Sequence, residues 1–149
     1  MLDISAEPRT AAAGAPETLD VFGATLSVVS DGSSMPMVLG EQMVPPGYGV
    51  PTHFHEIDDE LFYFLEGELV MIGPEGETTV GRGACVQLPR GVPHGFRNAS
   101  GAIARMLVAL TPGVQGLEMF RHFDRAGRSA PLAPEDIIGI AAQYGVRFV

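Results

Sequence analysis

Between residues 18 and 111, apolar positions alternate with polar ones or gather in short runs, and glycine or proline interrupts them every few residues. This pattern is typical of β-strands joined by tight turns. A series of many short strands predicts an antiparallel β-sandwich or barrel. We expect strands at residues 19–29, 37–44, around 53–55, 60–65, 68–72, 78–80, 84–88, 94–98 and 102–110.

The pattern changes after residue 111, where apolar residues recur at helical spacing. Residues 114–123 predict one helix, and residues 135–143 predict a second one with proline and acidic side chains at its start. We therefore expect a barrel at residues 18–111 and a helical tail at residues 112–149 that packs on it. Three apolar side chains of the first helix should lie on the sheet edge or over the barrel mouth, namely Leu117, Phe120 and Phe123.

The 149-residue chain has the size of one domain, and its formal net charge is −9. All 9 basic residues are arginines, which excludes a Schiff-base lysine and a phosphate-loop lysine. An acidic chain without a basic stripe is a poor candidate for binding nucleic acid or an anionic membrane. Residues 1–17 are rich in proline, glycine and alanine and predict an extended or flexible arm.

The single cysteine, Cys85, cannot form an internal disulfide. Together with an acidic, polar start that does not resemble a signal peptide, this predicts a cytoplasmic protein. Cys85 lies within the apolar run ACVQL and is expected to be a core residue.

Two histidines separated by one residue give the first chemical signal. Side chains alternate between the two faces of a strand, so His53 and His55 point to the same side. A turn at Asp58-Asp59 leads into an aromatic strand that starts at Glu60 and can bring this carboxylate opposite the imidazoles. His94, which opens a later strand, supplies a fourth ligand. Three imidazoles and one carboxylate fit a divalent transition metal such as iron, manganese, nickel, cobalt, copper or zinc.

The segments around these residues are similar to the two sequence motifs of the cupin superfamily. The first motif reads Gly, five residues, His-x-His, four residues, Glu, six residues, Gly; the second reads Gly, five residues, Pro-x-Gly, two residues, His, three residues, Asn. The resemblance implies a double-stranded β-helix, the jelly-roll barrel of cupins. Every motif position is occupied: Gly47, His53, His55, Glu60, Gly67, Gly83, Pro89, Gly91, His94 and Asn98.

The chain also resembles the single-domain cupins described as quercetin 2,3-dioxygenase-like, which carry a Thr-Pro-Gly segment and a helical tail after the last strand. The resemblance implies a dioxygenase for a small, flat, enol- or hydroxyl-bearing substrate, with Glu60 as the catalytic base. An isomerase, decarboxylase or lyase could use the same metal without O2. A non-enzymatic small-molecule-binding cupin is the third alternative, since a fold does not determine a function.

Strand alternation also predicts the surroundings of the metal. Phe62 and Phe64 share the face of Glu60, and Phe96 shares the face of His94. These three phenylalanines are therefore candidates for an apolar substrate pocket, with plain core packing as the alternative.

The outward positions of the aromatic strand carry Leu61, Tyr63 and Leu65, which favours a homodimer. His122 lies in the first tail helix. It could be an acid or base at the barrel mouth, but we favour a surface or interface residue.

Overall fold

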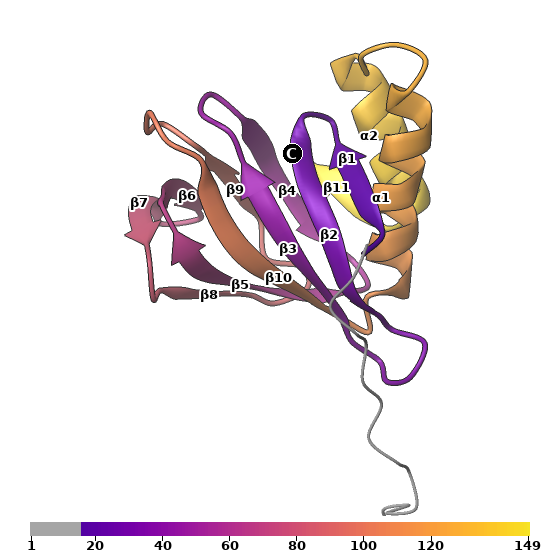
Figure 1. The fold of residues 1–149 in the computed structure, drawn as a ribbon, viewed down its shortest axis with the longest axis horizontal. Coiled ribbons are helices and arrows are strands. Elements are labelled where there is room, and N and C mark those ends of the chain that lie inside the picture. The colour runs from indigo at the N-terminus through magenta and orange to yellow at the C-terminus, as the bar shows by residue number, and fades with distance from the viewer. Residues whose placement is uncertain (1–15) are drawn as a thin grey trace, which may run out of the picture.

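The structure, a computed structural model, describes residues 16–149, so most of the predicted N-terminal arm lies outside the described residues. Two antiparallel sheets face each other, with strand orders β1-β2-β3-β10-β5-β8 and β11-β4-β9-β6-β7 (Figure 1). The predicted all-β fold, a double-stranded β-helix with a helical tail, is confirmed. The barrel strands are β1 (Thr18–Val21), β2 (Ala24–Asp31), β3 (Val38–Val44), β4 (Gly49–His55), β5 (Asp59–Glu66), β6 (Glu68–Gly73), β7 (Gly76–Gly81), β8 (Cys85–Leu88), β9 (His94–Arg97) and β10 (Ala104–Thr111).

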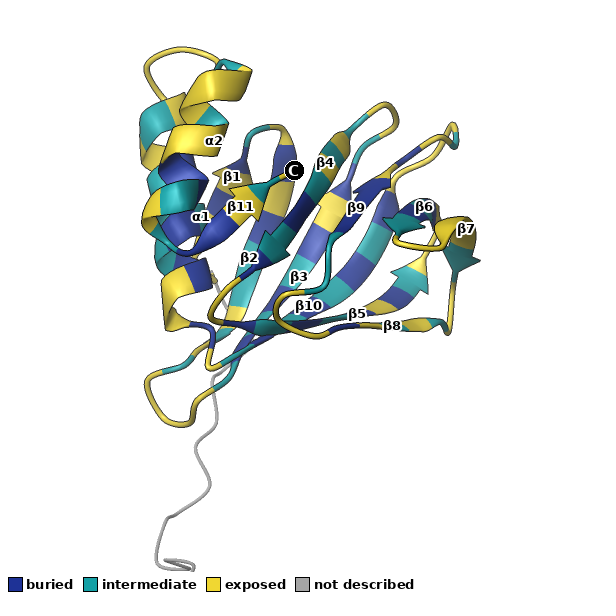
Figure 2. Ribbon diagram, turned by 180° about the vertical axis from the view of Figure 1, so that it is seen from behind, coloured by how far each residue is buried: buried dark blue, intermediate teal, exposed yellow. Residues whose placement is uncertain are grey.

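The hydrophobic core lies between the sheets, where every second side chain of each central strand points. Buried and partly exposed residues alternate strictly along β10, as the banding in Figure 2 shows for the strands. The β10–β5 register places Phe64 opposite Met106 and Glu60 opposite Leu110. Because Phe64 and Glu60 both lie on the inward face of β5, a carboxylate enters the interior on the same face as the aromatic core.

The single strand expected at residues 19–29 is wrong, because β1 and β2 form a hairpin that turns at Phe22-Gly23. Phe22 has φ 37° and Gly23 has φ 114°, a conformation that is uncommon for a residue with a side chain. The ring of Phe22 stacks on Tyr48 at 5.6 Å and meets Phe123 edge-on at 5.1 Å. Contacts with distant segments therefore stabilise this turn, which the local apolar sequence does not predict.

Cys85 is not the core residue that the sequence predicted. It is exposed on β8, which forms an edge of its sheet, and it pairs with Tyr63 on the outward face. Of the β8 residues only Leu88 is buried. An apolar run at a sheet edge thus has no second layer to cover its outer side.

The tail contains the two expected helices, α1 (Val114–Gly127) and α2 (Pro134–Gln143), and α1 continues four residues beyond its predicted end. It also contains β11 (Val146–Phe148), a strand that the sequence analysis missed. β11 pairs with β4, the histidine strand, and the helices lie at the end of the sandwich beside β1 and β11 (Figure 1). In the described part of the chain, neither helix is long and apolar enough to cross a membrane.

A buried carboxylate connects the tail to the barrel. Asp58, just before β5, is 2% exposed. Its carboxylate accepts hydrogen bonds from the backbone N–H groups of Gly113 at 2.8 Å and Gly116 at 3.2 Å. These groups belong to the start of α1, where the helix dipole favours an anion. A Cβ on Gly116 would come within 2.6 Å of a methyl carbon of Leu110, so this approach requires glycine. Asp58 therefore determines where α1 begins on the barrel.

Replacing Asp58 with alanine should lower the free energy of unfolding by about 1–3 kcal/mol, because two buried amides lose their acceptor. Urea denaturation followed by circular dichroism measures this change. The control is Asp59→Ala, which removes an exposed ion pair to Arg90 at 2.9 Å and an exposed hydrogen bond from the backbone N–H of Arg90, and which should cost less. Equal losses for both variants would show that Asp58 does not have this anchoring role.

Candidate metal centre

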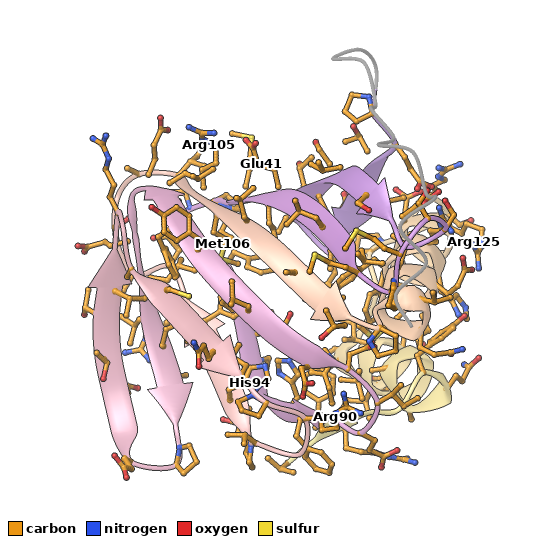
Figure 3. The ribbon with its side chains drawn as sticks, turned by 90° about the horizontal axis from the view of Figure 1, so that it is seen from below. Glu41, Arg90, His94, Arg105, Met106 and Arg125 are labelled. Carbon is orange, nitrogen blue, oxygen red and sulfur yellow. The ribbon has the colours of Figure 1, made fainter. Side chains whose placement is uncertain are left out.

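The fold brings the four predicted ligands together from three strands of two sheets. His53 and His55 lie two residues apart on β4 and are both buried. β9 pairs with β4 so that His94 lies directly opposite His53, with ring centroids 4.5 Å apart. Glu60 comes from β5 in the facing sheet. Figure 3 shows His94 among the side chains that fill the space between the sheets.

The potential ligand atoms of these four residues all lie within 4.8 Å of one another. Oε2 of Glu60 is 3.1 Å from Nε2 of His94 and 3.3 Å from Nε2 of His55. All four side chains are buried. Three imidazoles and one carboxylate that converge in this way could hold a divalent transition metal.

Backbone carbonyls orient two of the imidazoles for this role. Nδ1 of His53 donates to the carbonyl of Pro51 at 2.8 Å, and Nδ1 of His94 donates to that of Val92 at 2.9 Å. A carbonyl can only accept, so the proton sits on Nδ1 and Nε2 is left to face the cluster. Nδ1 of His55 has no hydrogen-bond partner. Among residues 16–149 it is the only fully buried side-chain nitrogen or oxygen atom without one.

The charges in the cluster influence each other. Burial, with a further contribution from His94, lowers the pKa of His53 to about 4, so this ring is neutral at pH 7. Burial alone would raise the pKa of Glu60, but the three histidines outweigh it and lower that pKa. Burial would likewise lower the pKa of His94, yet its hydrogen bond to Glu60 raises it. The carboxylate of Glu60 thus favours positive charge on its neighbours in the cluster. A bound cation would provide such a charge.

Three residues of the cluster, His53, His55 and Glu60, line a cavity with a free volume of about 50 Å³. Phe62 and Phe96 line this cavity and meet edge-on at 5.6 Å. Phe64, the third candidate pocket residue, is completely buried in the core and is not among the lining residues. The remaining lining is mostly apolar: Val21, Phe22, Gln42, Tyr48, Val50, Met119, Phe120, Phe123, Ala141, Val146 and Phe148.

The tail supplies much of this lining. Phe120 and Phe123 reach the cavity from α1, whereas Leu117 is buried but does not line it. Phe148 of β11 lies opposite His53 in the strand pairing, with the rings 5.4 Å apart. Sequence reasoning missed Phe148 because a three-residue strand shows no alternation. It also missed Gln42, although alternation along β3 places this residue inward.

His122 stands apart from the cluster. It is partly buried in α1, and its Nδ1 lies 3.1 Å from the hydroxyl of Tyr144, which follows α2. The two rings meet edge-on, and His122 does not line the cavity. This position joins the two tail helices and gives no support to an acid or base role at the barrel mouth.

Comparison with known protein families agrees with this geometry. Residues 40–110 match the Cupin_2 family, described as a cupin domain, and this range contains both motifs and all four clustered residues. This part of the chain is a cupin domain. The quercetinase-like subgroup that the sequence suggested is only loosely supported.

Three relatives of this cupin point to different chemistries. It is 30% identical over 74 residues to the tetracenomycin polyketide synthase protein TcmJ of Streptomyces glaucescens, covering 50% of each chain. The polyketide cyclase RemF of Streptomyces resistomycificus is 34% identical with a TM-score of 0.53, over 60% of this chain and 65% of RemF. A cupin sugar phosphate isomerase from Silicibacter pomeroyi is 28% identical with a TM-score of 0.56, over 61% and 60%. The chain thus spans about half the length of its curated relative and under two thirds of these two structures.

Purified natively, the cupin should contain about one divalent metal ion per chain, bound by the four clustered residues. His53→Ala and His94→Ala should each reduce the metal content at least tenfold, as measured by inductively coupled plasma mass spectrometry. His122→Ala is the matched control, because it removes the one histidine outside the cluster and should leave the metal content unchanged. Metal loss in the control alone would move the site to the tail.

Proposed function

We propose that this cupin is a metal-dependent enzyme for a small, flat organic substrate with an enol or hydroxyl group, and that it is a dioxygenase. One observation carries the proposal: four side chains that could ligate a metal converge beside a mostly apolar cavity rich in aromatic rings, and three of them line it. Apolar walls exclude water and strengthen the electrostatic interactions inside. They also suit a flat ring better than a polyhydroxylated chain.

A bound divalent cation would acidify a substrate hydroxyl and provide open positions beside the four ligands. His53, His55 and His94 would hold this cation through ring nitrogens that face the cluster. Glu60 lies at the centre of the cluster, and its lowered pKa keeps it ionised at pH 7. It can therefore accept the proton that the substrate hydroxyl releases. This is the base role that the family resemblance suggested for Glu60.

The tail determines access to this site. The free volume of about 50 Å³ holds a few water molecules, not an aromatic ring. Phe120 and Phe123 from α1, together with Phe148 from β11, must therefore move aside when a substrate enters. Their return would seal the reacting group from water, as mobile segments do in many enzymes.

The charge of the lining argues against a sugar phosphate, despite the resemblance to the isomerase. No arginine is among the residues that line the cavity, and the chain contains no lysine. A phosphate group would therefore have no side-chain cation to neutralise it.

A cyclisation or isomerisation without O2 is the second candidate. It is favoured by the similarity to RemF, a polyketide cyclase, and to TcmJ, a polyketide synthase protein. Polyketide chains are rich in carbonyl groups flanked by acidic C–H bonds, which a carboxylate base can deprotonate. Glu60 would then take a proton from carbon instead of from a hydroxyl group.

Metal-loaded protein should convert at least one compound from a panel of flavonols and small diketones, and its turnover should stop without O2. An oxygen electrode and anaerobic assays measure this. Turnover that persists without O2 would support the cyclase-type reaction, and tight binding without any turnover would overturn the enzymatic proposal.

In the same assay, Glu60→Gln should lower the turnover per bound metal by about 10²–10⁴-fold, because the base is lost. Glu56→Gln is the control, since this nearby carboxylate is exposed and pairs with Arg147 at 2.9 Å. Unchanged turnover per metal in Glu60→Gln would exclude Glu60 as the base.

We also propose that this cupin forms a homodimer through the outer face of the β1–β8 sheet. Tyr63 is 41% exposed there, and Leu61 and Leu65 flank it. Charged residues lie on the same face, as Figure 3 shows for Arg105 and Glu41, which are 3.1 Å apart. An apolar patch with charges beside it suits an interface core with a polar rim.

Light scattering should give the mass of a dimer at micromolar concentration, and Tyr63→Glu should shift it to that of a monomer. The control is Ile138→Glu on α2, which changes a residue that is 49% exposed and outside this face. A monomeric wild-type protein would contradict the proposal.

A further inference from the structure

Gln42 is a buried polar residue that the metal cluster does not use. It lies in β3 at an inward position, between Gly40 and Val44 on the same face of the strand. Gln42 is 7% exposed, and it lines the same cavity as His53, His55 and Glu60. One molecule in this cavity can therefore reach both Gln42 and the metal cluster.

The side-chain amide of Gln42 has no hydrogen-bond partner among residues 16–149. The amide atoms are not fully buried either, because Nδ1 of His55 is the only fully buried side-chain nitrogen or oxygen in this range that lacks a partner. The amide thus touches open space, and the space that Gln42 lines is the cavity. Buried amides are normally paired, so an open one facing a cavity is ready to bind a ligand.

The other polar side chains that line the cavity already have a hydrogen-bond partner or belong to the metal cluster. The hydroxyl of Tyr48 donates to the carbonyl of Val21 at 3.0 Å. The histidines and Glu60 belong to the metal cluster, and the rest of the lining is apolar. Gln42 is therefore the one lining side chain that can select a substrate by a hydrogen bond away from the metal.

We propose that Gln42 binds and orients the substrate by hydrogen-bonding an uncharged oxygen group, a carbonyl or a hydroxyl, on the part of the substrate that does not face the metal ligands. This rests on the proposed function, because it assumes a flat substrate held at the metal centre. The group is uncharged because the cavity offers no arginine or lysine to pair with an anion. A substrate without this oxygen would leave the amide unpaired and would be discriminated against.

The first test needs no substrate. In the ligand-free protein, Gln42→Met should raise the melting temperature by about 2–4 °C, because it removes an unpaired buried amide at nearly constant volume. Asn98→Leu is the matched control and should lower it, because the amide of Asn98 donates to Val44 at 2.9 Å and Ala102 at 2.8 Å. A lower melting temperature in Gln42→Met would show that Gln42 is a structural residue and overturn the proposal.

The second test measures the binding of two probes of similar shape, 3,4-dihydroxyacetophenone and 4-ethylcatechol, to zinc-loaded protein by calorimetry. The two catechol hydroxyls can face the metal, and only the first probe offers a further carbonyl. This carbonyl also acidifies the catechol, so the readout is the ratio of the two dissociation constants in wild type against Gln42→Met. We expect the preference of the wild type for the carbonyl probe to fall about tenfold in the variant.

The outcomes separate the two proposals. An unchanged ratio in a variant with unchanged zinc content would overturn the role of Gln42 and leave the metal-dependent function standing. A wild-type protein that binds neither probe would contradict the substrate class of the proposed function. In that case the melting temperatures alone would still decide whether the amide of Gln42 is unpaired.

Discussion

The structure depends on the position of a single carboxylate, Glu60, which projects from one sheet into the interior and meets three imidazoles, two from β4 and one from β9. Burying an ionised group is costly unless it is paired. Here the pairing comes from rings whose outer nitrogens are held by backbone carbonyls in two of the three cases. The arrangement places a negative charge at a buried site, and a divalent cation is a suitable partner for it.

The tail is part of this site and not an appendage. β11 extends the sheet of the histidine strand, and aromatic side chains from α1 and β11 line the cavity. Asp58 explains the position of the tail, because its carboxylate accepts hydrogen bonds from backbone N–H groups at the start of α1. In the sequence, Asp58 lies only a few residues from His55 and Glu60. The turn that joins β4 and β5, which carry three of the four clustered residues, therefore also positions the start of α1.

Stability and function compete in this cavity. A neutral amide without a partner, a strained Phe22 and an unpaired imidazole nitrogen all lie in residues that line it. Each of these features has a cost in stability that a plain apolar core without them would not have. Such features concentrate where a protein keeps space for a ligand, because selection for binding opposes perfect packing.

Features that depend on local sequence patterns could be predicted from the sequence, whereas features that depend on contacts between distant segments could not. The histidine pair of the candidate metal site was visible in the sequence because strand alternation is a local rule, and His53 and His55 obey it wherever the strand lies. The jelly roll was implied by the resemblance of the two motifs to those of cupins, and the tail helices followed from their periodicity. By contrast, the Phe22-Gly23 turn, the exposure of Cys85 and the β11–β4 pairing arise from contacts between segments far apart in sequence. Whether Phe64 or Phe148 lines the cavity depends on which side chains fill a shared volume, and no local pattern encodes that.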